Sequence, residues 1–274
     1  MKLTGKTALV TGTSPNIGGG IAEALAAEEA NVICVDLNPA YALGCAGSIK
    51  QQGGNALGLV CDVTDENQVL ATLDKAYAEF QGIDILVNGA VIFNRKGVLN
   101  MPLTEWRSQI DVILTGAFLF TKHVARRMID QGNQGCVINI ISSAGHQGEP
   151  GNVGYGTGKG GLLNFTRSVA MELAEHGIRV NSLTPTATDS TEGAQRAADW
   201  GVEWPGPRLG DRRKGMLPNA DLGLPLLQRP SPRHYGKAAV FLASDDAEMI
   251  TGFDMRVDAG AISRYWLWDP GAPE

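Results

Sequence analysis

Short apolar runs recur along the chain and alternate with longer segments in which apolar residues fall at helical spacing. Because each run is short and apolar, it is interpreted as a buried strand. In chain order the predicted strands are Thr7–Thr11, Asn31–Asp36, Asn55–Cys61, Ile83–Val87, Cys136–Ile141, Arg179–Leu183 and Asp254–Val257. Strands that alternate with helices in this way predict an α/β fold, with a parallel sheet covered by helices on both faces.

The segments between the strands predict helices. In the helix that follows Tyr155, a core-facing stripe is formed by Leu162, Phe165, Val169 and Leu173. The other predicted helices are Ile21–Ala30, Asp65–Phe80, Thr104–Asp130 and Ser231–Leu242. No repeat, low-complexity tract or linker interrupts the pattern, so residues 1–274 are predicted to form a single domain.

The pattern breaks between Thr186 and Pro230. This segment is rich in proline and leucine and holds Trp200 and Trp204. A loop of this length is usually functional, and its apolar content argues against disorder, so residues 186–230 are predicted to be a lid over the substrate. The C-terminal tail, residues 262–274, is rich in aromatic side chains that we expect to pack on this lid or on a neighbouring subunit.

Composition and charge narrow the class of protein. Of the 274 residues 43% are hydrophobic and 19% are charged, as in an ordinary soluble globular protein. A net charge of −6 argues against a nucleic-acid surface, and no apolar run is long enough to span a membrane. The four cysteines form no C-x-x-C pair and no signal-peptide h-region is visible, so we expect reduced thiols in a cytoplasmic protein. The histidines show no ligand spacing, so no metal site is expected.

A glycine-rich turn, Gly12–Gly20, joins the first strand to the first helix. In a dinucleotide-binding fingerprint, Gly12 permits the tight turn, and Gly18 lets the helix pack closely and direct backbone N–H groups at a pyrophosphate. Asn16 stands at the middle position in place of glycine. Asparagine tolerates left-handed backbone angles, so the loop is expected to survive this change. An ordinary glycine-rich turn without a ligand is the alternative.

An acid ends the second strand. The Asp36 carboxylate could accept hydrogen bonds from the adenosine ribose hydroxyls and would repel a 2′-phosphate. No arginine or lysine lies at positions 11–20 or 36–41 to bind that phosphate, so NAD is predicted over NADP. A second acid, Asp62, follows the third strand, where it could meet the adenine amino group or cap the next helix.

Tyr155 and Lys159 lie four residues apart at the start of a predicted helix, so their side chains share one face. A lysine ammonium beside a phenol favours the phenolate, and should lower the pKa of Tyr155 from about 10 toward the working pH. Such a tyrosine can take a proton from an alcohol or give one to a developing alkoxide. Taken alone the motif is weak, and two residues on a partly exposed helix face are the simpler interpretation.

Together these residues resemble the short-chain dehydrogenase/reductase family, over about residues 3–261. The resemblance depends on the order and spacing of Thr11-Gly12, Gly18, Asp36, Asp62-Val63, Asn88-Gly89-Ala90, Ser142, Tyr155, Lys159, Arg179-Val180-Asn181-Ser182 and Thr251-Gly252. It implies a Rossmann-type doubly wound sheet of about seven strands and hydride transfer to or from a nicotinamide. It also implies self-association as a homotetramer or homodimer.

The resemblance implies roles for individual residues. Tyr155 would be the general acid/base, Lys159 would lower its pKa and hold the nicotinamide ribose, and Ser142 would hydrogen-bond the reacting oxygen. Adjacent Ser143 is the alternative, because a one-residue slip turns a strand side chain to the other face. Pro185 begins a turn beside the nicotinamide. Cofactor contacts are expected from Gly12, Asn16, Ile17, Gly18, Asp36, Leu37, Asp62, Val63, Asn88, Gly89, Ala90, Tyr155, Lys159 and Pro185.

Four positions depart from the family pattern. Asn16 and Thr186 replace glycines, and Val91 replaces the glycine that usually follows Asn-x-Ala. Ile113 stands where many members carry an asparagine that helps to hold a water in a proton relay from the lysine. Since a backbone carbonyl can make that contact with any side chain, Ile113 weakens the relay without excluding catalysis.

We therefore expect an NAD-dependent dehydrogenase that interconverts a secondary alcohol and a ketone. The tryptophan and leucine content of the lid and tail favours a bulky apolar or aromatic substrate, contacted by Ser142, His146, Tyr155, Trp200 and Trp204. Polar residues in the bordering loops keep a sugar or polyol as an alternative. The remaining alternatives are an NAD(H)-binding regulator or scaffold with little turnover, and an enzyme that reduces a C=C bond or epimerises its substrate.

Overall fold

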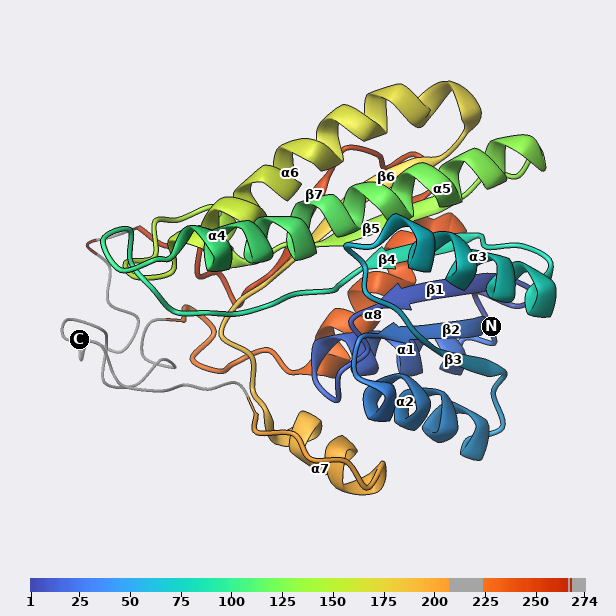
Figure 1. Ribbon diagram of the computed structural model, residues 1–274, viewed down its shortest axis with the longest axis horizontal. Coiled ribbons are helices and arrows are strands. Elements are labelled where there is room, and N and C mark those ends of the chain that lie inside the picture. The colour runs from blue at the N-terminus through green and yellow to red at the C-terminus, as the bar shows by residue number, and fades with distance from the viewer. Residues whose placement is uncertain (207–223, 266, 268–274) are drawn as a thin grey trace.

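The computed structural model describes residues 1–206, 224–265 and 267. Within these residues seven parallel strands form one sheet, in the order β3-β2-β1-β4-β5-β6-β7 (Figure 1). The strands are β1 Thr7–Thr11, β2 Asn31–Asp36, β3 Ala56–Val60, β4 Ile85–Asn88, β5 Cys136–Ile140, β6 Arg179–Pro185 and β7 Asp254–Val257. The Rossmann-type parallel sheet expected from the sequence is confirmed.

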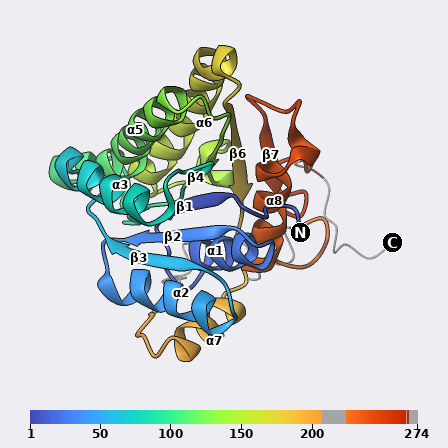
Figure 2. The same ribbon diagram turned by 90° about the vertical axis from the view of Figure 1, so that its right-hand side faces the viewer.

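Helices cover both faces of the sheet, as Figure 2 shows. One face carries α1 Ile17–Ala27, α2 Pro39–Gln51 and α8 Pro232–Ala243, and the other carries α3 Glu66–Phe80, α5 Gly116–Asp130 and α6 Val153–Leu173. Helix α4 Leu103–Ile110 runs into α5 through a π-helical turn, Asp111–Thr115. The long helix predicted over residues 104–130 is thus present, with an altered centre. Helix α7 Thr191–Asp199 lies in the segment predicted to be a lid.

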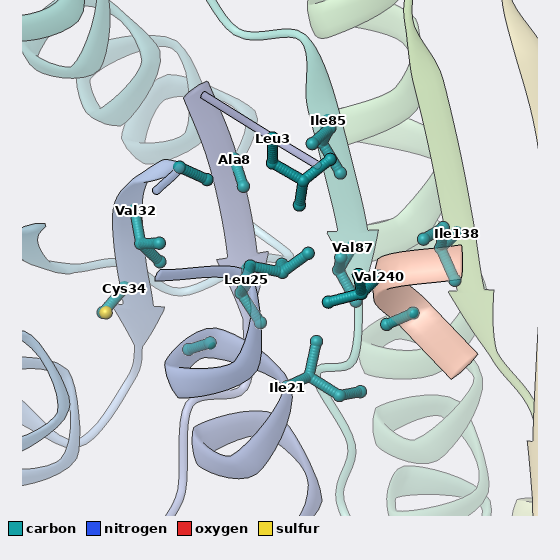
Figure 3. Close-up of a cluster of buried hydrophobic side chains, with 14 of the residues drawn as sticks. Leu3, Ala8, Ile21, Leu25, Val32, Cys34, Ile85, Val87, Ile138 and Val240 are labelled. Atoms are coloured by element: carbon teal, nitrogen blue, oxygen red, sulfur yellow. The ribbon is translucent and has the colours of Figure 1, made fainter. Parts of the chain in front are cut away.

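Side chains of the strands alternate between two apolar cores. In β1, Ala8 and Val10 join the core beneath α1 and α8, whereas Leu9 joins the core beneath α3 and α5. Figure 3 shows the first core, where Ile21 of α1 lies close to Val240 of α8. Because both faces of β1, β4 and β5 are buried, these central strands have nearly continuous apolar runs in the sequence.

Among the described residues, helix α2 is a long element that the hydrophobic pattern does not predict. It buries mainly small side chains, with Ile49 as the largest, so its apolar stripe is weak. Its start is marked instead by Asn38, whose side-chain oxygen accepts a hydrogen bond from the Ala40 N–H, and by the proline that follows. A capping signal was therefore present in the sequence where the hydrophobic pattern gave none.

Several expectations stay predictions. The four cysteines are buried and free, but the reduced, cytoplasmic state is not tested by this. No described helix combines the length and the apolar character needed to cross a bilayer. Residues 207–223 of the expected lid, and residues 266 and 268–274 of the tail, lie outside the described residues, so the division into one domain, lid and tail also stays a prediction.

Candidate active site and cofactor cavity

A cavity of about 600 Å³ opens at the carboxyl ends of the central strands. Strand β1 has β2 on one side and β4 on the other, so the direction in which strands are added to the sheet reverses at β1. Open α/β sheets bind ligands at such a reversal of strand order. The walls come from the loops after β1, β4 and β5, the ends of β2 and β6, and the first turns of α1, α2 and α6. The predicted site residues that line it are Gly12, Asn16, Ile17, Gly18, Asp36, Gly89, Ser142, Tyr155, Lys159, Pro185 and Trp204.

Two glycines shape one end of the cavity. Gly12 has a φ of 75°, which other residues rarely adopt, and a Cβ atom there would lie 2.7 Å from the Gly89 carbonyl oxygen. A Cβ atom on Gly18 would collide with the Gly12 carbonyl oxygen, so α1 can begin directly against the loop. The result is a bare backbone cradle at a helix N-terminus, which suits a pyrophosphate.

Asn16 lies in this cradle with an unexpected backbone. Its φ is −89°, so the left-handed conformation invoked for asparagine at this position is not used. Its Oδ1 atom is buried and has no hydrogen-bond partner among the described residues. Because buried polar atoms are normally paired, this oxygen fits a loop that is completed by a ligand.

The Asp36 carboxylate lines the same end of the cavity. One of its oxygens accepts the Asn38 N–H at 2.9 Å, and burial raises the pKa of the carboxyl to about 6. The group is therefore mostly ionised at pH 7 and above. Leu37, predicted beside it as a cofactor contact, is exposed and does not line the cavity.

Asp62 and Val63 follow β3 and do not line the cavity. The Asp62 carboxylate accepts hydrogen bonds from the N–H and the hydroxyl of Thr64, at 2.9 and 2.7 Å. Helix α3 is capped by Asp65, whose carboxylate accepts two N–H groups of the first turn. The helix-capping alternative considered for Asp62 is therefore wrong, and an adenine contact by Asp62 stays a prediction.

Asn88 and Ala90 lie behind the cavity wall, where Asn88 belongs to a buried amide network. Nδ2 of Asn88 donates to Asn139 Oδ1 on β5 at 2.9 Å and to Thr121 Oγ1 on α5 at 3.0 Å. Nδ2 of Asn139 donates in turn to Thr166 Oγ1 on α6 at 2.9 Å. The network ties the ends of β4 and β5 to the two helices that cover them.

Ser142, Tyr155 and Lys159 converge at the other end of the cavity. Tyr155 lies in the first turn of α6, and Ser142 lies just after β5, near enough to the phenol to act on its pKa. Lys159 lies one turn further along α6, with Nζ 5.9 Å from the centre of the phenol ring. The ammonium donates to the Ile140 carbonyl oxygen at 2.5 Å. The structure thus brings together the three residues for which catalysis was predicted.

The pKa of Tyr155 is raised, in contrast to the lowering by Lys159 that the sequence led us to expect. Burial of the phenol is the largest cause, and Glu149 adds to it, whereas Ser142 and Arg95 oppose it. Lys159 is 2% exposed, and burial lowers the pKa of its ammonium to about 7. Burial therefore affects both groups more than their mutual attraction does, and leaves a protonated phenol beside an amine that titrates near neutral pH.

An ion pair extends the cavity wall beyond Tyr155. Nη1 of Arg95 lies 3.1 Å from Oε1 of Glu149, and the guanidinium carbon lies 4.8 Å from the centre of the Phe93 ring. Phe93 contacts Tyr155 edge to face, with 4.9 Å between ring centres. The second carboxylate oxygen of Glu149 accepts a hydrogen bond from Asn152 at 2.8 Å. This part of the wall carries one positive and one negative charge, so its net charge is zero.

Two of the predicted substrate contacts lie away from the cavity. His146 follows the Ser142 loop, but its Nε2 atom lies 3.2 Å from Oδ2 of Asp254, so the ring connects that loop to β7. Trp200 packs on α1 and α2 at the outer side of the molecule. Trp204 does line the cavity, at the end formed by the glycine-rich loop. Substrate contacts by His146 and Trp200 stay predictions.

The model of the short chain dehydrogenase family matches residues 6–201. The chain belongs to this family. It is similar to a D-threitol dehydrogenase of Mycolicibacterium smegmatis, 36% identical over 259 residues that cover 94% of each chain. It is also similar to a 3-oxoacyl-[acyl-carrier-protein] reductase of Vibrio cholerae, 35% identical over 265 residues, 95% of this chain and 98% of that one. The crystal structure of an NAD+-bound xylitol dehydrogenase, 29% identical, superposes with a TM-score of 0.83 over 94% of this chain and 99% of that chain.

Ile113 is the departure from the short-chain dehydrogenase pattern that bears most on catalysis. Its side chain is 1% exposed, lies in the π-helical turn and does not line the cavity. A Cβ atom on Gly158 would lie 3.0 Å from Ile113 Cδ1, so the isoleucine packs directly beneath α6. Ile113 itself offers no side-chain amide to order a water, and Lys159 donates to the Ile140 carbonyl.

Thr186, which stands where the family pattern has a glycine, contacts Ser143, the alternative to Ser142. Its hydroxyl donates to Ser143 Oγ at 3.3 Å. This bond gives Ser143 a side-chain partner, whereas Ser142 Oγ accepts the Ala144 N–H at 3.2 Å.

Proposed function

We propose that the protein is an NAD-dependent dehydrogenase that oxidises a secondary hydroxyl group of a linear polyol to a ketone, and catalyses the reverse reduction. The observation that carries the substrate class is the Arg95–Glu149 pair in the cavity wall beside Tyr155. The likeness to proteins named for D-threitol and xylitol supports the same class. Self-association as a homotetramer or homodimer belongs to the proposal, because members of the family are commonly oligomeric.

The Arg95–Glu149 pair suits a neutral substrate with several hydroxyl groups. The guanidinium offers donors, the carboxylate offers acceptors, and their charges cancel. A hydroxyl group can bond to both, whereas an apolar chain would desolvate the pair without compensation. The pair therefore favours a polyol over the bulky apolar substrate expected from the tryptophans of the lid, and over a fatty acyl chain.

The residues around the reacting oxygen divide the chemistry between them. Ser142 and Tyr155 would hold the substrate hydroxyl, and Tyr155 would remove its proton as general base. When bound, the nicotinamide ring supplies the hydride acceptor. Lys159, whose ammonium has a pKa of about 7 in this buried position, would stabilise the Tyr155 phenolate when it is protonated.

Turnover of a substrate panel tests the proposal. With NAD⁺, we expect NADH formation from D-threitol, xylitol and galactitol, and little from aryl or steroid alcohols. Glu149→Gln should raise KM for the polyols by about 10- to 100-fold, because a hydrogen bond to a charged group contributes about 1.5–3 kcal/mol. The same change should leave KM for 2-butanol, which has a single hydroxyl group, within about twofold of wild type.

Glu105→Gln is the matched control for this experiment, since Glu105 also forms an ion pair, with Lys96, but does not line the cavity. It should leave all the Michaelis constants unchanged. Good turnover of apolar alcohols with none of polyols would refute the proposed substrate class. NADH binding without turnover of any panel member would instead favour the NAD(H)-binding regulator.

The cofactor preference has a separate test at Asp36. Asp36→Asn removes the charge that repels a 2′-phosphate, so the ratio of the NADPH and NADH dissociation constants should fall by about tenfold or more at pH 8. Because the pKa of this carboxyl is about 6, it loses its charge as the pH falls through that value. The preference of wild type for NADH over NADPH should therefore weaken between pH 8 and pH 5.5. The preference of the variant should stay constant over the same interval.

Titration of cofactor fluorescence at each pH measures these constants. Asp74→Asn, which neutralises an exposed carboxylate on α3, is the control and should behave as wild type. Tighter binding of NADPH than of NADH by wild type at pH 8 would contradict the preference for NAD.

A further inference from the structure

The first part of the expected lid is attached to the helices beside the glycine-rich loop, as Figures 1 and 2 show for α7. Nε of Arg196 lies 2.7 Å from Oε2 of Glu23 on α1, and Nη1 donates to the Pro15 carbonyl oxygen at 2.9 Å. The side chains of this ion pair are 13% and 18% exposed, so it is well shielded from water. Helix α7 is thereby held against the loop that begins α1.

Trp200 adds an apolar anchor at the end of α7. Its ring atom Cη2 lies 2.7 Å from the position that a Cβ atom on Gly19 would take, and its Cβ lies 3.1 Å from that position on Gly44. The indole therefore fits where both α1 and α2 lack a side chain. The polar and the apolar anchors together fix α7 on the half of the molecule that carries Asp36.

After α7 the chain returns to the cavity. The phenol of Tyr41, on α2, donates to the Glu203 carbonyl oxygen at 3.1 Å. Burial raises the pKa of this phenol, and the Asp36 carboxylate raises it further. The Trp204 indole lies against Gly193 of α7, 2.8 Å from the position of a Cβ atom there, and Asn16 Oδ1 lies 3.2 Å from the same position. Tyr41 and Trp204 both line the cavity.

We propose that Tyr41, Glu203 and Trp204 form a clasp over the adenosine diphosphate half of the dinucleotide. Trp204 covers the end near the pyrophosphate cradle. Tyr41 covers the end near Asp36, the carboxylate predicted to bind the ribose. The Tyr41–Glu203 hydrogen bond, called the latch below, holds the two parts together. The first part of the lid then retains the cofactor rather than covering the substrate. This inference rests on the dinucleotide site of the proposed function and is independent of the polyol.

The clasp has a direct signature in binding, because ADP-ribose contains the adenosine half of the cofactor and lacks the nicotinamide. Trp204→Ala should raise the dissociation constants of ADP-ribose and NADH by the same factor, about tenfold or more. Tyr41→Phe keeps the ring but removes the latch, and should raise both constants by about two- to tenfold. In both variants we expect the increase to come from faster NADH release, with KM for the alcohol substrate unchanged at saturating NAD⁺.

Calorimetry with ADP-ribose and stopped-flow displacement of NADH measure these quantities. Leu43→Ala, an exposed residue of the same helix as Tyr41, is the control and should bind both ligands as wild type does. Trp204→Phe keeps an aromatic ring, and recovery of most of the ADP-ribose affinity in this variant would support a packing contact.

An unchanged ADP-ribose affinity in folded Trp204→Ala and Tyr41→Phe would overturn the clasp, and a raised KM for the alcohol in the same variants would place Trp204 on the substrate instead. Failure of wild type to bind ADP-ribose would refute the dinucleotide site itself. Failure of the polyol panel alone, with ADP-ribose binding weakened in both variants, would refute the substrate class and leave the clasp intact.

Discussion

Tyr155→Phe is expected to lower kcat for the alcohol substrate by on the order of 10²-fold or more, because the variant has no group to take the hydroxyl proton. The substitution keeps the ring that packs edge to face on Phe93, so the cavity wall should be preserved. The dissociation constant of NADH should change little. Initial rates at saturating substrate and NAD⁺, together with an NADH titration of the same preparation, measure both effects.

Tyr77→Phe is the matched control, since this tyrosine lies on α3 and does not line the cavity. It should retain wild-type activity. If Tyr155→Phe kept nearly full activity, Tyr155 would be excluded as the acid/base. Another group would then have to take the proton of the substrate hydroxyl.

Lys159→Met is expected to change how the free energy of unfolding depends on pH. Burial lowers the pKa of this ammonium from 10.5 to about 7 in the folded protein, so between these values the unfolded chain binds more protons. The stability of wild type should therefore rise with pH across this interval, by about 1.4 kcal/mol per pH unit from this group. Below pH 7 the lysine is charged in both states, and its full destabilising effect is present.

Urea unfolding of wild type and variant at pH 7, 8 and 9, at one protein concentration, measures this slope. The difference between the two curves isolates Lys159 from the other groups that titrate there. Lys75→Met, at an exposed position of α3, should reproduce the wild-type slope. Equal slopes in Lys159→Met and wild type would show that the ammonium keeps its ordinary pKa in the folded protein.

The sheet could be predicted from the sequence because its central strands, such as β1, β4 and β5, are buried on both faces. Such strands are continuous apolar runs, and their alternation with helices leaves few possible topologies. The pattern gave no signal for α2, which buries mostly small residues, and none for α7, which lies in a segment rich in proline and glycine. The position of α7 depends instead on Arg196 and Trp200, whose partners are far away in the chain.

Within the site, spacing was sufficient where the residues belong to one element and its neighbour. Tyr155 and Lys159 share one helix, and Ser142 ends the adjacent strand. The pKa values could not be predicted in the same way, because burial depends on the whole fold and reversed the expected shift of Tyr155. Tyr41 was missed because the contact that gives it a role, the Glu203 carbonyl, belongs to the backbone and has no sequence signal.

The buried amide network has a consequence for how precisely the active site can be built. Asn88 and Asn139 face each other across β4 and β5, two residues of otherwise apolar strands. Two aliphatic side chains could fill the same volume, but they would pack almost equally well in a shifted register, whereas a shift here would break the hydrogen bonds that Nδ2 of Asn88 and Nδ2 of Asn139 donate. The network therefore specifies a single alignment of the strand ends that lead to Gly89 and Ser142. We therefore expect these amides to contribute to the specificity of folding.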